Sequence, residues 1–195
     1  AETLQTARHQ IATALEAEIK NELCDLYMDK ADFKVTFTKG KFNRDGNEQV
    51  EFYISTNPGE GFKPLVKVAS GGELSRLMLA IKSAFARKED KTSIVFDEVD
   101  TGVSGRVAQA IAQKIHKIGS HGQVLAISHL PQVIAIADYQ FFISKESDNE
   151  TTVSRVRLVT PEERVQEIAK MLAGDNGTEA ALSQARALLK VDDSL

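Results

Sequence analysis

The spacing of apolar residues changes along the chain and separates segments of different expected structure. From Glu2 to Asp29 there is no Gly or Pro, and apolar residues recur about every 3.6 positions between charged ones, which predicts one long amphipathic helix. Apolar and polar residues then alternate from Phe33 to Phe37 and from Val50 to Ile54, with turn residues at 43–47 between the two runs. This alternation predicts an antiparallel hairpin.

The remaining pattern alternates between helix-like and strand-like segments. A helix pattern from Ser70 to about Lys88 precedes the short apolar strand Ile94–Phe96, and a second helix pattern at 104–117 precedes a buried strand at 124–127. A strand–helix–strand order predicts parallel strands with a right-handed crossover, so the fold class we expect is α/β. A second hairpin and two terminal helices complete the expected elements, at 139–144 with 151–158, at 161–173 and at 178–190.

Composition narrows the class of protein. With 42% hydrophobic and 27% charged residues, the 195-residue chain has the composition of a folded globular protein. Its net charge of −4 argues against coating nucleic acid by charge alone, although it allows a local basic patch. The single cysteine, Cys24, is expected to be a small buried residue, and no apolar leader or membrane span is evident, so we expect a cytoplasmic protein with no membrane partner.

Two carboxylates follow the first apolar strand. Asp97 and Glu98 come directly after Ile94–Phe96, and ligands of open α/β sheets collect at the carboxyl ends of strands. One carboxylate of such a pair holds Mg²⁺ while the other orients and deprotonates a water molecule. An acidic pair that merely caps a strand is the structural alternative.

The glycines that open the helix at 70–88 are a second candidate. In the run Ser70-Gly71-Gly72, glycines allow a phosphate to approach the backbone, and the free N–H groups of a helix start attract anions. The alternative is a plain helix cap, in which Ser70 and Glu73 form a capping box. His129 follows the second strand, where a single histidine is usually a core or loop residue.

Together these segments resemble the motifs of an ABC-type ATPase head. Ala69–Arg76 is similar to the signature motif, and Ile94–Glu98 is similar to the Walker B strand. Val99–Gly102 resembles the D-loop, and Ser128-His129 resembles the switch histidine. The order and spacing of the four segments match that family.

Longer strings narrow the resemblance within this superfamily. Ala69 and Glu73 depart from the transporter form of the signature and are similar to the chromosome-maintenance branch. Four strings resemble the RecN family of bacterial DNA double-strand-break repair proteins, which are SMC-like ABC ATPases: 67–73, 96–105, 128–133 and 167–174. The resemblance to this family covers nearly the whole chain.

The resemblance implies ATP and Mg²⁺ as cofactors and gives the motif residues their roles. Asp97 would organise Mg²⁺, Glu98 would be the general base, and His129 would contact the γ-phosphate.

Other motif residues would act on a second head. Ser70, Gly71, Gly72 and Glu73 would bind the γ-phosphate of ATP held by that head, so that ATP joins two heads into a homodimer. Asp100 would lie at the seam between the heads.

One motif of such ATPases is absent from the sequence. The phosphate loop has the pattern Gly-x-x-x-x-Gly-Lys-Ser/Thr, and the only Gly-Lys pair here, Gly40-Lys41, is followed by Phe42. We therefore expect residues 31–195 to be the C-terminal lobe of a head and residues 1–30 to be the root of a coiled-coil arm. The expected partners are the N-terminal half of the same head, a second head and DNA, in a nucleoid-associated protein. The isolated chain is expected to be inactive as an ATPase.

Alternatives remain open at this point. The chain could serve another chromosome-maintenance or repair ABC ATPase, or a transporter, or it could be a non-catalytic DNA-tethering or docking module. A hydrolase built on Ser128, His129 and Asp138 fits by residue type, but no nucleophile elbow is present. Basic clusters at 87–91 and 114–117 are expected to be solvated, so the sequence does not locate a DNA-binding surface.

Overall fold

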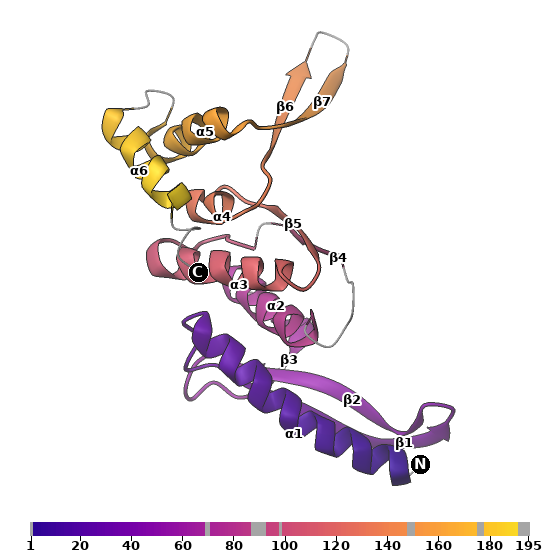
Figure 1. Cartoon of the computed structure of the whole chain (residues 1–195). Coiled ribbons are helices and arrows are strands. Elements are labelled where there is room, and N and C mark those ends of the chain that lie inside the picture. The colour runs from indigo at the N-terminus through magenta and orange to yellow at the C-terminus, as the bar shows by residue number, and fades with distance from the viewer. Residues whose placement is uncertain are drawn as a thin grey trace. The chain divides into compact units, whose positions relative to one another are not determined.

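The computed structural model describes residues 2–68, 71–86, 93–97, 99–147, 151–174 and 178–190 (Figure 1). The chain divides into two compact units, residues 1–126 and 127–195, and each is described by itself. The first unit holds α1 (Glu2–Asp25), β1 (Asp32–Asn43), β2 (Gly46–Ser55), β3 (Lys63–Pro64), the 3₁₀ turn η1 (Leu65–Lys67), α2 (Gly71–Ala86), β4 (Ser93–Asp97), α3 (Gly105–Gly119) and β5 (Gln123–Ile127), whose last residue begins the second unit. The second unit holds α4 (Pro131–Ala135), β6 (Phe141–Ser147), β7 (Thr152–Leu158), α5 (Pro161–Ala173) and α6 (Glu179–Lys190).

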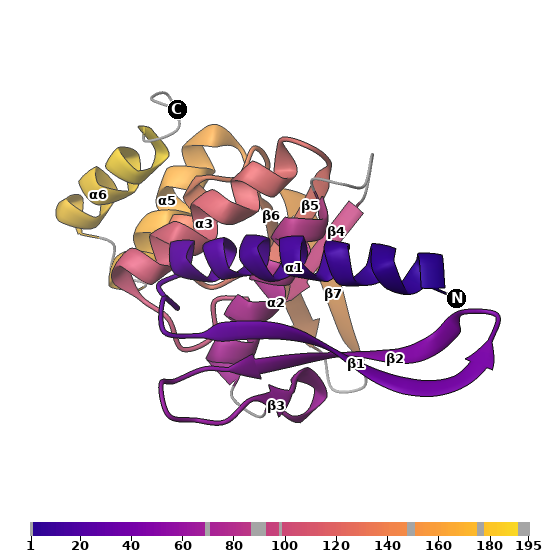
Figure 2. The same cartoon turned by 90° about the horizontal axis from the view of Figure 1, so that it is seen from below.

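Helix α1 lies along the β1–β2 hairpin (Figures 1 and 2). Its buried apolar residues, spaced three or four apart, form one face of the helix: Ala12, Leu15, Ile19 and Leu23. Glu16 adds a polar tie, because its Oε1 accepts a hydrogen bond of 2.7 Å from the backbone N–H of Val35. The expected first helix is thus confirmed.

The end of α1 differs from the sequence expectation by four residues. Tyr27 has a φ of 58°, and the backbone N–H groups of Tyr27 and Met28 bond to the carbonyls of Cys24 and Leu23 at 3.0 and 2.9 Å. This is a Schellman motif, which stops a helix. Cys24 itself is exposed, contrary to the expectation, because each residue turns about 100° around the helix and Cys24 follows the buried Leu23.

The predicted first hairpin is present and is longer than the alternating pattern indicated. Strands β1 and β2 pair antiparallel with Phe33 opposite Ile54 and Val35 opposite Phe52. Phe33, Val35 and Ile54 are buried beneath α1, which explains why their alternation with polar residues was visible in the sequence.

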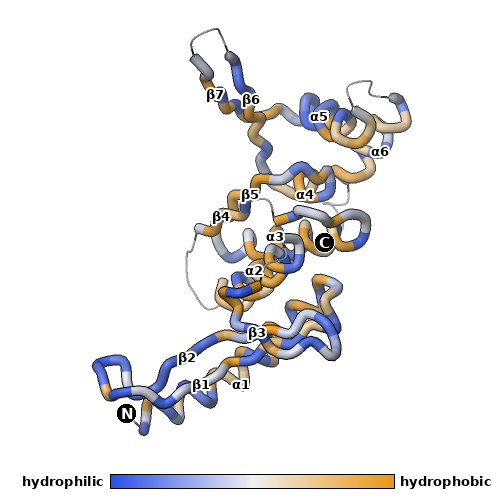
Figure 3. Tube along the Cα trace, turned by 180° about the vertical axis from the view of Figure 1, so that it is seen from behind, coloured by the Kyte–Doolittle hydropathy of each residue, from blue (hydrophilic) through white to orange (hydrophobic). Residues whose placement is uncertain are grey.

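Strands β4 and β5 pair with each other and are joined by α3, which confirms the α/β fold class. Phe96 is buried, but Val95, Leu125 and Ile127 are 55%, 48% and 52% exposed, on strands that Figure 3 shows in hydrophobic orange. The expectation of a fully buried strand at 124–127 is therefore wrong, because Leu125 and Ile127 are each about half exposed.

The second unit has a small helical core and a hairpin. Helices α4, α5 and α6 bury a cluster that includes Ile168, Ala169 and Ala185. The short helix α4, which begins at Pro131, was not predicted, because five residues carry too little periodicity. The two terminal helices are confirmed within one residue.

Helix α5 begins with a capping box between Thr160 and Glu163. The backbone N–H of Thr160 and then the Arg157 guanidinium lower the pKa of the Glu163 carboxyl, because both stabilise its charged form.

The predicted second hairpin is confirmed as β6 and β7. Within the described ranges, no helix is long and apolar enough to cross a membrane.

Candidate functional site

Helix α2 begins directly at the candidate glycines. Gly71 is its first residue, and Glu73 stands in its first turn, while Ser70 lies outside the described residues, as does its half of the expected capping box. Arg76 links this helix start to α1, since its Nε donates to the carbonyl of Gly72 at 3.3 Å and its Nη1 to that of Leu26 at 3.5 Å.

The two glycines have different surroundings. A Cβ on Gly72 would come within 2.7 Å of the backbone oxygen of Thr101, so the turn after β4 packs directly on this glycine. A Cβ on Gly71 would meet no described atom within 4 Å. Gly72 is therefore required for close packing, whereas Gly71 leaves its backbone open to a ligand.

This difference gives a test of packing. We expect Gly72→Ala to lower the free energy of unfolding by about 1–3 kcal/mol, because the methyl group meets a backbone oxygen that has little room to move. Gly71→Ala should change it by less than about 1 kcal/mol, because the site is open and alanine favours a helix. Urea unfolding of both variants measures the difference, and equal losses would contradict this packing.

The turn after β4 carries the next candidates. Asp97 is the last residue of β4 and is exposed, whereas Glu98 lies outside the described residues. Asp100 is fully buried, and its carbonyl accepts a hydrogen bond of 3.3 Å from Val103. Gly102 has a φ of 71°, which favours glycine. The structure thus brings the signature glycine and this turn together, with Asp100 supporting the turn from inside.

His129 lies in the second unit, two residues after the end of β5. It is exposed and follows β5, as expected from the sequence. The preceding Ser128 accepts a hydrogen bond of 3.0 Å at Oγ from the backbone N–H of Leu130, just before α4 begins.

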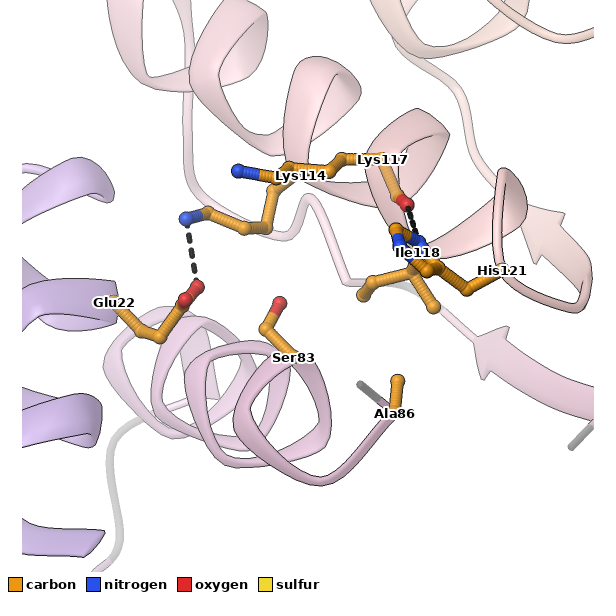
Figure 4. Close-up of a pocket in the computed structure, with 7 residues that line it drawn as sticks. All are labelled: Glu22, Ser83, Ala86, Lys114, Lys117, Ile118 and His121. Carbon is orange, nitrogen blue, oxygen red and sulfur yellow. Dashed lines mark hydrogen bonds and ion pairs between the residues drawn. The ribbon is translucent and has the colours of Figure 1, made fainter. Parts of the chain in front are cut away.

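Lys114 of α3 is a feature that sequence reasoning missed. Its Nζ lies 2.7 Å from Oε2 of Glu22 and 2.6 Å from Oδ2 of Asp25, both on α1 (Figure 4 draws the Glu22 pair). Lys114 and Glu22 are 8% and 7% exposed, so the expectation of a solvated basic cluster at 114–117 is wrong for Lys114. The signal was present, because Lys114 stands among the buried Ile111 and Ile115.

Residues of helices α1, α2 and α3 line a small pocket beside this ion pair. Glu22 of α1, Ser83 of α2 and Lys114 of α3 all line it (Figure 4). The Oγ of Ser83 is buried and has no hydrogen-bond partner among the residues that the structure describes. Helix α2 begins at the candidate glycines, and α3 follows the turn after Asp97. Residues of α1 therefore line the pocket together with residues of the two helices that adjoin the candidate motifs.

The described residues fit a nucleotide and Mg²⁺ only in part. Asp97 presents a carboxylate at a strand end, and Gly71 presents an open backbone at the start of a 16-residue helix, where anions bind. In the ranges that the structure describes, no group of three or more His, Cys, Asp or Glu residues is placed to hold a metal. Asp97 supplies one carboxylate of the kind through which Mg²⁺ binds, together with phosphates and water.

Comparison with known proteins finds that the chain is similar to bacterial DNA repair proteins. It is 51% identical to the DNA repair protein RecN of Halalkalibacterium halodurans over 98% of this chain and 35% of that protein. Identity is 48% to RecN of Bacillus subtilis and 38% to RecN of Vibrio cholerae, over 94% and 97% of this chain and 35% and 34% of those proteins. The chain thus spans about a third of the length of these relatives. No family model matches.

Solved structures supply the fold. The Smc head domain of Pyrococcus yayanosii, solved with a coiled coil and joint, matches 83% of this chain and 29% of that chain with a TM-score of 0.60 at 20% identity. A structure from work on ATP-driven dimerization and DNA-stimulated activation of SMC ATPases matches 86% of this chain and 96% of that chain with a TM-score of 0.55 at 17% identity. This chain is therefore RecN-like along nearly its whole length and has the fold of SMC head domains.

Proposed function

We propose that this chain is the C-terminal lobe of an SMC-like ATPase head that acts in the recombinational repair of DNA double-strand breaks. Residues 1–30 form the root of a coiled-coil arm and residues 31–195 form the lobe. The observation that carries the proposal is the similarity to RecN proteins over 94–98% of this chain but only 34–35% of theirs, together with the SMC head fold. The rest of such a protein supplies the phosphate loop that this sequence lacks.

Uncovered apolar strands support a missing half of the head. Val95 of β4 and Leu125 of β5 are about half exposed in the first unit. In the second unit, one face of the β6–β7 hairpin is apolar, and its cross-strand pairs, all more than half exposed, are Phe141 with Leu158 and Ile143 with Val156. A two-stranded hairpin is only marginally stable alone, so the N-terminal lobe of the same head is the partner that we assign to these faces.

The motif resemblance assigns catalytic roles to residues at the carboxyl ends of β4 and β5. Asp97 holds Mg²⁺, Glu98 takes the proton from the attacking water, and His129 contacts the γ-phosphate. When bound, Mg²⁺ neutralises phosphate charge, which is the chemistry it supplies to such sites. The exposure of Asp97 and of His129 supports these roles, since both side chains are accessible to a ligand.

The signature acts on the nucleotide of a second head. Ser70, Gly71, Gly72 and Glu73 bind the γ-phosphate of ATP held by that head, and the turn that contains Asp100 lies at the seam. The close approach of Gly72 to the backbone of Thr101 supports this arrangement, because the signature glycine and the turn are neighbours in space. ATP then joins two heads, and hydrolysis releases them.

A mixing experiment tests the action in trans. In the full-length protein, Ser70→Arg obstructs the phosphate seat and Glu98→Gln removes the base, so each variant alone should be nearly inactive. In a two-fold dimer of one of each, both defects fall in one site and the other site stays intact. Free mixing makes about half of the dimers mixed, so roughly a quarter of the parental ATPase rate should return.

The control for mixing is subunit exchange, followed by energy transfer between two labelled preparations. If exchange is complete and activity stays flat at every mixing ratio, the signature acts within its own chain and the trans assignment of Ser70 is wrong. If Glu98→Gln alone retains the parental rate, the general base is a residue other than Glu98.

A further inference from the structure

The tip of the β1–β2 hairpin exposes an aromatic ring on an irregular piece of strand. The register of the two strands shifts between Lys39 and Asn43, and Asn43 and Gly46 close the turn. Phe42 lies in the irregular segment with 76% of its surface exposed, which is more than either phenylalanine of β6 or loop residue Phe62. Figure 2 shows this end of the hairpin reaching past the rest of the sheet.

Basic residues precede and follow Phe42 in the sequence. Residues 39–45 carry three cations, Lys39, Lys41 and Arg44, and one acid, Asp45, in a chain whose net charge is −4. Arg44 lies 3.5 Å from Asp45, so this acid is matched locally. Within the part of the chain that the structure describes, neither Lys39 nor Lys41 has an ion-pair partner, and both are exposed.

Helix α1 supports the tip from behind. The His9 ring stacks on Phe37 with centroids 3.9 Å apart, and His9 Nε2 lies 3.2 Å from Oε1 of Glu48, whose side chain is only 11% exposed. Arg8 Nη1 lies 3.2 Å from the position that a Cβ on Gly46 would take. The nearest acid on β2 is thus engaged with α1, and the tip is held against a helix instead of standing free.

A single exposed phenylalanine is ordinary on a protein surface. An exposed ring that follows two exposed lysines, neither with an ion-pair partner among the described residues, is a combination that binds single-stranded nucleic acid, because lysines attract the phosphates and every base offers a face for stacking. Duplex DNA keeps its bases stacked inside, so it gains little from such a ring.

We propose that the β1–β2 tip is a binding site for single-stranded DNA, in which Lys39 and Lys41 contact phosphates and Phe42 stacks on an unpaired base. The choice of DNA as the nucleic acid rests on the proposed function in DNA repair. The site itself is assigned from the tip alone.

Binding of a fluorescein-labelled mixed-sequence oligonucleotide, followed by anisotropy across a salt series without ATP, tests the site in this chain and in the full-length protein. Phe42→Ala should weaken binding of the single strand roughly 5- to 100-fold, because one stacked base is lost. Its effect on a duplex of the same sequence should stay within about twofold. The double variant Lys39→Ala/Lys41→Ala should reduce the slope of log affinity against log salt by about 1.4, which is about 0.7 for each lost phosphate contact.

The matched control is Phe62→Ala/Lys63→Ala, which removes an exposed phenylalanine and an exposed lysine near the opposite end of the same sheet. It should bind as the parent does, and thermal unfolding should show all variants folded, since the tip residues are exposed. No binding by the parent chain, or equal losses in the control and the tip variants, would overturn the proposal. Equal losses for single strand and duplex with Phe42→Ala would overturn the stacking role.

This test separates the site from the proposed ATPase function. A full-length protein that hydrolyses ATP normally while its tip variants bind DNA like the parent would leave the ATPase function standing and remove the tip as its DNA site. If the full-length protein has no ATPase activity and its tip variants lose single-strand binding, the tip site stands and the ATPase function is wrong.

Discussion

Glu98→Gln in the full-length protein should reduce ATP hydrolysis by about 10²–10⁴-fold, because the proposed general base is lost. Glutamine keeps the size and shape of the side chain, so ATP binding should persist. Bound ATP would then no longer be cleared, and ATP-joined dimers should accumulate. The prediction thus couples a lost rate to a gained assembly, which loss of folding would not produce.

Phosphate release measures the rate, and light scattering after gel filtration with ATP measures the dimer. The 195-residue chain alone, which lacks a phosphate loop, serves as the blank. Glu162→Gln is the matched control, because it makes the same change at an exposed position in the first turn of α5, which is assigned no part in ATP binding or hydrolysis. A Glu98→Gln protein that hydrolyses ATP at the parental rate would place the base elsewhere.

The sequence predicted the elements well where one face of an element is buried within the chain. The α1 stripe and the alternation at Phe33 and Val35 both arise from burial against each other, so periodicity reported them correctly. The same reasoning failed at β5, because an apolar strand reads as buried whatever covers it, and here Leu125 is half exposed.

The sequence did not predict the backbone motif that ends α1 or the close packing of Gly72 on the turn after β4. The Schellman end of α1 depends on a left-handed Tyr27, a conformation that usually belongs to glycine, so no residue type announced it. Of the two signature glycines, only the structure shows that Gly72 packs on Thr101 and Gly71 does not. Family resemblance named the candidate residues, and geometry separated their tasks.

The buried pair of Lys114 and Glu22 carries the largest stability prediction. Lys114→Met should lower the free energy of unfolding of this chain by about 3–5 kcal/mol, because it removes a buried cation that lies 2.7 Å from the buried Glu22 carboxylate. Asp25 has a side chain that is 64% exposed, so water replaces the lysine there and the loss arises mainly at Glu22.

The double variant Glu22→Leu/Lys114→Met separates the pair from the packing around it. Apolar residues of similar size remove both charges at once, so its stability should return to within about 1 kcal/mol of the parent or exceed it. Lys117→Met is the matched control on the same helix, where the lysine is exposed and the change should cost less than about 0.5 kcal/mol. Urea unfolding of the parent, Glu22→Leu, Lys114→Met and the double variant gives the coupling energy of the pair, and Lys117→Met is measured beside them. A loss below about 1 kcal/mol for Lys114→Met would mean that water reaches Glu22, and α1 would then not be tied to α3 through this pair.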